Sequence, residues 1–152
     1  MNDDPLAPVL TDFCAEVGLP NAARVISRRM VQVKGMDVVF WHVEDDDPDH
    51  LYLHFQFGAI AAGRTLRAWR LMLEANMVIY AKDDARMAVD PDSGGVVLLV
   101  KVRLGPDITG RWLADTLAHY GEHGLYWQGN IFDCPDELFN GIASGAYQWI
   151  RC

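Results

Sequence analysis

The stretch from His50 to Phe57 alternates strictly between polar and apolar side chains, and this pattern constrains the fold more than any other in the chain. A period of two places one set of side chains on each face of an extended strand. The apolar face carries Leu51, Leu53, Phe55 and Phe57, and the polar face carries His50, Tyr52, His54 and Gln56. The stretch therefore predicts a β-strand that lies in a sheet with one buried face.

Two further strand candidates precede this stretch. Val25 to Lys34 alternates imperfectly, whereas Asp37 to Val43 is apolar on both faces, which indicates a strand that is covered on each side or keeps one face for a partner. Lys34-Gly35 and the acidic loop Glu44 to Asp49 are natural chain reversals between these segments. We therefore expect a three-stranded antiparallel meander.

A helix is predicted on each side of the meander. Leu6 to Val17 has apolar residues at steps of three and four, and Gly18 ends this pattern. Leu66 to Asn76 is rich in strong helix formers, but the branched and aromatic residues from Val78 to Tyr80 favour an extended chain. Because asparagine tolerates a left-handed backbone, we place the end of the second helix at Asn76.

The segment after Asn76 predicts three more strands and a last helix. The strands are Met77 to Lys82, Arg86 to Val89 and Val96 to Leu104, with a hairpin turn at Asp83-Asp84. Asp107 is the expected N-cap of the last helix, whose inner side carries Trp112, Leu113, Leu117 and Tyr120. The prediction is one α+β domain over residues 1–132, ordered helix, three strands, helix, three strands, helix, with a C-terminal extension over residues 133–152.

Composition narrows the class of protein and its partners. The apolar fraction is 51%, and no run reaches roughly 18 consecutive apolar residues, which predicts a soluble globular protein. The net charge of −8 would repel nucleic acid. No lysine or arginine precedes Arg24, so the charged start of a secretory signal is missing and we expect a cytoplasmic protein. Cys14, Cys134 and Cys152 are odd in number and widely spaced, which predicts reduced thiols.

One motif indicates a catalytic alternative. Residues 119–123 read H-x-x-E-H, the pattern with which zinc peptidases hold the metal through two histidines, here His119 and His123, and activate water through a glutamate, here Glu122. Such a site needs a third protein ligand. The carboxylates after the motif are Asp133, Asp136 and Glu137. Because Gly121 also loosens the helix, a zinc metallopeptidase stays the alternative, and we expect no metal, no cofactor and no catalytic residue.

Other charged clusters favour a solvated surface. Six arginines could bind phosphate or an acidic peptide, but no glycine-rich loop accompanies them, so we expect ordinary salt-bridged positions. They are Arg24, Arg28, Arg29, Arg64, Arg67 and Arg70. The acidic loop Glu44 to Asp49 lacks the ligand spacing of an EF-hand. His50 and His54 would lie about 13 Å apart along their strand, too far to hold one ion together.

Several short segments carry a pattern known from one protein family. They are Leu71 to Asn76 before a strand, Met87 to Asp90 and Val96 to Val100 after it, and a final helix with Leu113, Leu117 and Tyr120 and with Trp127 near its end. Together with the order of the elements, they resemble the type III secretion chaperones of the Tir-chaperone (CesT) family over roughly residues 5 to 132. YbjN-like proteins are similar in fold, so a YbjN-like regulatory binding domain is a further alternative.

The resemblance implies an ATP-independent chaperone without enzymatic activity. Such a protein would bind an N-terminal segment of an effector in extended form and keep it soluble and competent for secretion. The partners to expect are a type III secreted effector, a second copy of the chain and the secretion ATPase, with no membrane insertion. By resemblance, we place the effector groove between the first helix and the sheet, at Leu10, Phe13, Val31, Val33, Val39 and Trp41.

A second surface predicts assembly. The helix face with Leu66, Trp69 and Leu73, and the strand with Val78 and Tyr80, offer more apolar surface than one small domain easily covers. We expect a homodimer interface at these five residues, as the resemblance also implies.

Overall fold

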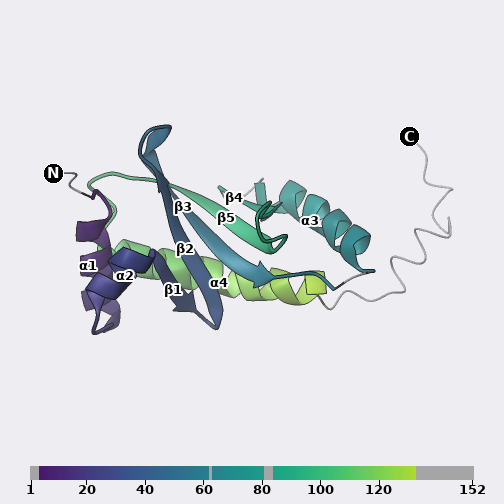
Figure 1. Ribbon diagram of the computed structural model, residues 1–152, viewed down its shortest axis with the longest axis horizontal. Helices are drawn as coiled ribbons and strands as arrows, with labels where there is room; N and C mark the ends of the chain where they lie inside the picture. The colour runs from purple at the N-terminus through teal and green to yellow at the C-terminus, as the bar shows by residue number, and fades with distance from the viewer. Residues whose placement is uncertain (1–3, 62, 81–83, 133–152) are drawn as a thin grey trace.

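The computed structural model describes residues 4–61, 63–80 and 84–132. The elements are α1 (Ala7–Val17), α2 (Ala22–Arg28), β1 (Met30–Val33), β2 (Met36–Val43), β3 (Asp47–Gly58), α3 (Thr65–Tyr80), β4 (Ala85–Val89), β5 (Val96–Arg103) and α4 (Gly110–Phe132). They form an α+β fold in which α4 runs along the sheet and α3 lies beside β4 (Figure 1).

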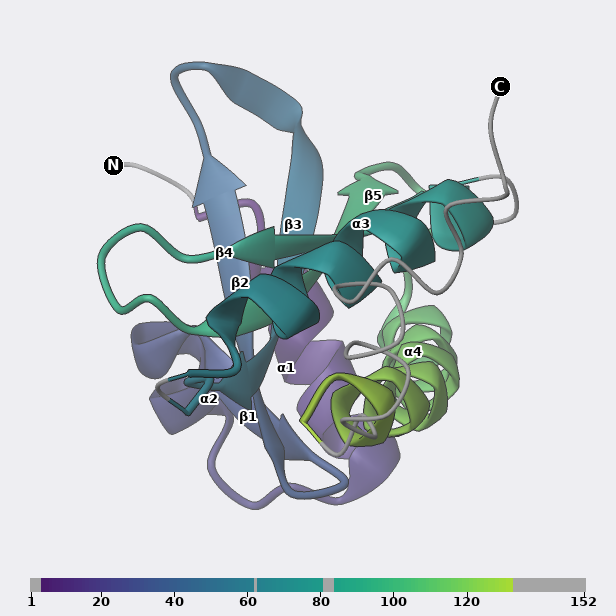
Figure 2. The ribbon, with the colours of Figure 1, turned by 90° about the vertical axis from the view of Figure 1, so that its right-hand side faces the viewer.

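The five strands form one antiparallel sheet in the order β1-β2-β3-β5-β4. The alternation along β3 is confirmed, because Leu51, Leu53 and Phe55 are fully buried and the polar residues between them are partly exposed. The packed helices α1 and α4 cover the buried face, whereas α3 contacts β4 at the opposite edge of the sheet from β1 (Figure 2). The edge strand β1 therefore lies away from α3.

The helix α1 matches its prediction. Gly18 adopts a left-handed backbone with φ of 74° and ends the helix, while Leu10, Phe13 and Cys14 are buried. Its contact with α4 is close: Asp12 Oδ2 accepts a hydrogen bond of 2.7 Å from the backbone N–H of Gly110. A Cβ at Gly110 would overlap the backbone nitrogen of Phe13, so this crossing requires glycine.

The strand predicted for Val25 to Lys34 is wrong in its first half. The chain there forms the short helix α2, because the side chain of Asn21 accepts a hydrogen bond from the backbone N–H of Arg24 and caps the helix. Arg29 then adopts a left-handed backbone with φ of 52°, and β1 starts at Met30. Helical packing of Val25 against the core outweighs the β-propensity of this branched residue.

The predicted end of the second helix at Asn76, and the strand from Met77 onward, are also wrong. The helix α3 continues to Tyr80, and residues 81–83, with the start of the predicted turn, lie outside the described residues. The side chain of Asn76 accepts a hydrogen bond of 2.5 Å from the backbone N–H of Met87 and donates one of 3.1 Å to its carbonyl. From its place in α3, the side chain of Asn76 thus forms hydrogen bonds with the backbone N–H and C=O groups of Met87 at the outer edge of β4.

The last helix begins later than predicted. Thr109, rather than Asp107, is its N-cap, because the hydroxyl oxygen of Thr109 accepts a hydrogen bond from the backbone N–H of Trp112. The helix continues through Gly121 to Phe132. A Cβ at Gly121 would lie 2.8 Å from the side chain of Val33, so this glycine allows close packing instead of loosening the helix. The order is helix, helix, three strands, helix, two strands, helix.

The strand predicted at Val96 to Leu104 is confirmed as β5, and the C-terminal extension over residues 133–152 lies outside the described residues. Within the described part of the chain, no helix combines the length and hydropathy of a membrane span.

Candidate functional site

A groove of about 760 Å³ lies where α1, α2, β1 and α4 meet. Its apolar lining comes from all four elements and from the turn after α1. These residues are Phe13, Val17, Leu19, Val25, Met30, Val31, Val33, Ala114, Leu117 and Ala118. Val17 and Leu19 are 46% and 41% exposed, so part of this apolar surface is open to solvent. An open groove of this size and character suits a bound apolar segment.

The strand β1 presents a free edge beside the groove, since it pairs with β2 alone among the described strands. The backbone N–H of Phe40 donates a 2.7 Å hydrogen bond to the carbonyl of Arg29. Arg29 and Phe40 therefore form a hydrogen-bonded pair. Because hydrogen-bonded and non-hydrogen-bonded pairs alternate in an antiparallel ladder, the backbone of Val31, two residues later, also bonds to β2. Met30 and Gln32 therefore direct their backbone N–H and C=O groups away from β2, where another strand could bind them.

Charged side chains surround the apolar lining. Arg24, Arg28 and Lys34 line the groove together with one carboxylate, Asp37. Lys34 forms an ion pair of 3.6 Å with Glu122 on α4. The groove thus carries three cations against one carboxylate, although the whole chain has a net charge of −8.

The six residues predicted to bind an effector do not form one surface. Phe13, Val31 and Val33 line the groove, whereas Leu10 is buried in the core. The other two, Val39 and Trp41, line a separate pocket of about 490 Å³. The prediction missed the groove residues Val17, Leu19, Arg24 and Arg28. Arg24 and Arg28 lie on α2, a helix that the N-cap signal of Asn21 in the sequence could have revealed.

Trp41 marks the open face of the sheet. Its side chain is 54% exposed, and its ring stacks on that of His54 with centroids 6.1 Å apart. The neighbouring residue Phe40 is 2% exposed on the other face. Burial lowers the pKa of His54, so this histidine is predominantly neutral at pH 7. The alternation of β2 therefore leaves one apolar face uncovered at this point.

The residues predicted for a dimer interface lie along the outer side of α3. Leu66, Trp69, Leu73 and Val78 are exposed, and Met77, which the prediction missed, extends the same stripe. Their exposed fractions run from 48% for Trp69 to 84% for Met77. The inner side of α3 carries the buried residues Ala68, Met72 and Ala75. Val78 belongs to the helix rather than to a strand, and the side chain of Tyr80 is not described.

The H-x-x-E-H motif lies on the outer side of α4. His119 and His123 are exposed, with ring centroids 4.6 Å apart, and Glu122 is paired with Lys34. Within the described ranges, no group of three or more histidine, cysteine, aspartate or glutamate side chains is placed to hold a metal ion. Nothing in this part of the chain supplies the third ligand that the zinc peptidase alternative needs.

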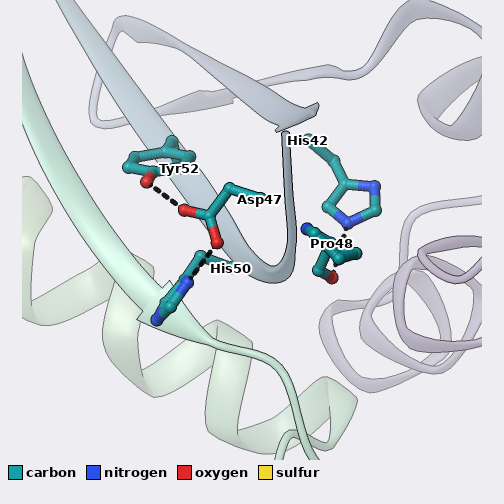
Figure 3. Close-up of polar contacts among 5 residues, drawn as sticks. All are labelled: His42, Asp47, Pro48, His50 and Tyr52. Atoms are coloured by element: carbon teal, nitrogen blue, oxygen red, sulfur yellow. Dashed lines mark hydrogen bonds and ion pairs between the residues drawn. The ribbon is translucent and has the colours of Figure 1, made fainter. Parts of the chain in front are cut away.

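A polar cluster organises the turn between β2 and β3 (Figure 3). One oxygen of Asp47 accepts a hydrogen bond of 2.5 Å from the hydroxyl of Tyr52, and the other lies 2.6 Å from Nδ1 of His50. The hydrogen bond from Tyr52, followed by that with His50, holds the pKa of Asp47 below its ordinary value. His42 Nε2 donates to the carbonyl of Pro48, so the cluster stabilises the turn of a hairpin.

The comparisons with known proteins give one matching family model and solved structures with a similar fold. The model of the Tir chaperone protein (CesT) family matches residues 9–117. A structure of the ExsC-ExsE complex is similar with a TM-score of 0.62 and 18% identity, over 86% of this chain and 96% of that chain. The heterodimeric ExoU-SpcU complex from the type III secretion system of Pseudomonas aeruginosa is similar with a TM-score of 0.54 and 18% identity, over 81% and 97%. No curated protein matches the chain.

Proposed function

The chain belongs to the Tir chaperone protein (CesT) family, and we propose from this premise that it is a type III secretion chaperone for an effector protein. The match confirms the resemblance read from the sequence, and it names this family rather than the YbjN-like proteins. The similar structures, at 18% identity, support the α+β fold. Both are complexes of two proteins, and the ExoU-SpcU complex belongs to a type III secretion system, which supports the same setting here.

The observation that carries the proposal is the apolar groove beside the free edge of β1. An extended segment of an effector could add to this edge through the backbone groups of Met30 and Gln32. Every second side chain of such a segment would then face the apolar lining around Val31 and Leu117. The proposed client segment lies near the N-terminus of the effector and is held extended, which keeps it soluble and ready for secretion.

The proposed activity is binding without catalysis. Binding through backbone hydrogen bonds and apolar contacts at an open groove makes and breaks no covalent bond. Release of the bound segment needs no nucleotide at this site. We propose that the chaperone acts without ATP in the cytoplasm and that any energy for release comes from the secretion ATPase, as a second partner.

We also propose a homodimer through the outer side of α3. The stripe of Leu66, Trp69, Leu73, Met77 and Val78 is apolar and exposed. Contiguous apolar surface of this kind marks an interaction site. A stable interface of about 1,200 to 2,000 Å² in total would cover it. Since α3 lies at the opposite edge of the sheet from β1, both grooves of a dimer would stay open.

The test of the groove uses two exposed apolar residues and a matched control. The double variant Val17→Ser/Leu19→Ser removes groove contacts without opening the core, and Val89→Ser changes another exposed valine, on β4 outside the groove. Each variant is co-expressed with the N-terminal segment of a type III effector from the native host. We expect the double variant to melt like the wild type and to lose the effector, while Val89→Ser retains it. Full retention by the double variant would refute the groove as the binding site.

A further inference from the structure

The cations of the groove indicate what kind of segment it takes. We infer that the groove selects segments that carry carboxylate side chains at alternate positions next to their apolar residues. This inference rests on the proposed function of the groove and adds the charge pattern of the client. The side chains that would bind these carboxylates are Arg24 and Arg28, which are both exposed on α2 and both line the groove.

Arg24 and Arg28 differ from other cations of the chain that form ion pairs. Arg29 forms an ion pair of 2.5 Å with Asp4, and Arg70 forms one of 3.1 Å with Glu74. Lys34, the third cation of the groove, is held by Glu122. In the described part of the chain, neither Arg24 nor Arg28 has a side-chain ion pair. Their guanidinium groups are available to a bound carboxylate, with which arginine makes two parallel hydrogen bonds.

The spacing of the two arginines fits an extended chain. They are four residues apart in a helix, which separates them by about 6 Å along its axis. Residues two apart in an extended strand present side chains on the same side about 6.6 Å apart. Two carboxylates at alternate positions of a client could therefore meet Arg24 and Arg28 at once, while the intervening side chains face the apolar lining.

The net charge of the protein sharpens this selection. With 21 acidic and 13 basic residues, most of the chain would repel an acidic segment. In the groove lining, Arg24 and Arg28 stand against the single carboxylate of Asp37, and Lys34 is paired with Glu122. An acidic client would be attracted at this place and repelled elsewhere, which sets its position and register along β1.

The experiment is a selection of short random peptides displayed on phage, with the intact protein as bait. Three baits are compared: the wild type, Arg24→Glu/Arg28→Glu, and the control Arg103→Glu/Arg111→Glu, which reverses two exposed arginines outside the groove. We expect the wild type and the control to recover apolar peptides with aspartate or glutamate two residues apart. The groove variant should recover apolar peptides with lysine or arginine there.

A binding measurement then quantifies the effect. A recovered acidic peptide is compared with its version in which asparagine or glutamine replaces the acids. We expect the amide version to bind the wild type roughly 3- to 20-fold more weakly in about 0.1 M salt, with little difference near 1 M salt. On Arg24→Glu/Arg28→Glu the preference between the two peptides should reverse.

The failures of the two proposals are distinguishable. Recovery of apolar peptides without an acidic pattern, or of acidic peptides by all three baits alike, would overturn the inference and leave the groove as a binding site. If the wild type recovers no apolar extended pattern at all, the proposed function of the groove falls as well.

Discussion

At the scale of single residues, glycine decides how closely α4 packs. Gly110 touches the backbone of α1, and Gly121 touches the side chain of Val33 in β1. Both glycines are buried, and a Cβ added at either position would overlap neighbouring atoms. Gly129 lies on the same helix, and a Cβ added there would meet nothing within 4 Å, which makes it a matched control. The contact at Gly110 joins α4 to α1 and the contact at Gly121 joins α4 to β1, and all three elements line the groove.

The first prediction concerns these glycines. Gly110→Ala should lower the free energy of unfolding by about 2 kcal/mol or more, because the added methyl group meets backbone atoms of Phe13 that cannot move aside. Gly129→Ala should leave stability unchanged or raise it by up to about 1 kcal/mol through helix propensity. Urea denaturation at equilibrium measures both. A Gly110→Ala variant as stable as the wild type would show that the α1–α4 crossing is described wrongly.

The second prediction concerns Asp47 in the β2–β3 turn. Its hydrogen bond from Tyr52 is the largest cause of its lowered pKa, so Tyr52→Phe should raise that pKa. Because the folded pKa lies below the unfolded value, the stabilisation by Asp47 is present above the unfolded pKa and is lost as pH falls through the folded one. Carboxylate carbon shifts in an NMR titration follow Asp47, with Tyr126→Phe as the control. An unchanged titration in Tyr52→Phe would contradict the hydrogen bond.

At the scale of elements, the sequence predicted those whose pattern is complete within the segment. The alternation of β3 and the spacing of α1 each carry enough signal, and both are found where expected. The failures are segments in which a tertiary contact outweighs local propensity. The branched residues after Asn76 stay helical because Asn76 bonds to Met87 on β4, eleven residues later. No local pattern reveals such a contact.

The candidate site was predicted in part for the same reason. Phe13, Val31 and Val33, which the family resemblance placed at the groove, line it from α1 and β1. The wall formed by α2 was missed, since Val25 and its neighbours were assigned to a strand. Arg24 and Arg28, which contribute positive charge to the groove, were missed together with this wall.

The third prediction separates core from surface among the residues first placed at the groove. Phe13 is 4% exposed and Trp41 is 54% exposed. Phe13→Ala should lower the free energy of unfolding by roughly 3 to 5 kcal/mol, whereas Trp41→Ala should cost about 1 kcal/mol or less. Thermal melting compares the two variants. Equal losses of stability would contradict the burial of Phe13 or the exposure of Trp41.

At the scale of the whole molecule, the surfaces proposed for assembly and for effector binding lie at opposite edges of one sheet. The free edge of β1 borders the groove, and α3 covers the edge at β4 and turns its apolar stripe outward. In the proposed dimer, this arrangement would leave both grooves open.

The fourth prediction tests the dimer. Trp69→Glu places a charge in the middle of the exposed stripe on α3, and it should convert a homodimer into a monomer with little change in folding. Light scattering at micromolar concentration measures the molar mass, and Trp41→Glu is the control on the other surface. A monomeric wild type, or a Trp69→Glu variant that stays dimeric, would count against this interface.

The most direct test of the central claim is amide hydrogen exchange at β1, with and without the N-terminal segment of an effector from the native host. In the free protein, the amides of Met30 and Gln32 point away from β2 and should exchange fast, while the amide of Val31 is protected. If the effector segment adds to this edge as a strand, Met30 and Gln32 should become protected in the complex and Val31 should stay so. Unchanged fast exchange at Met30 and Gln32 in a fully formed complex would contradict the account.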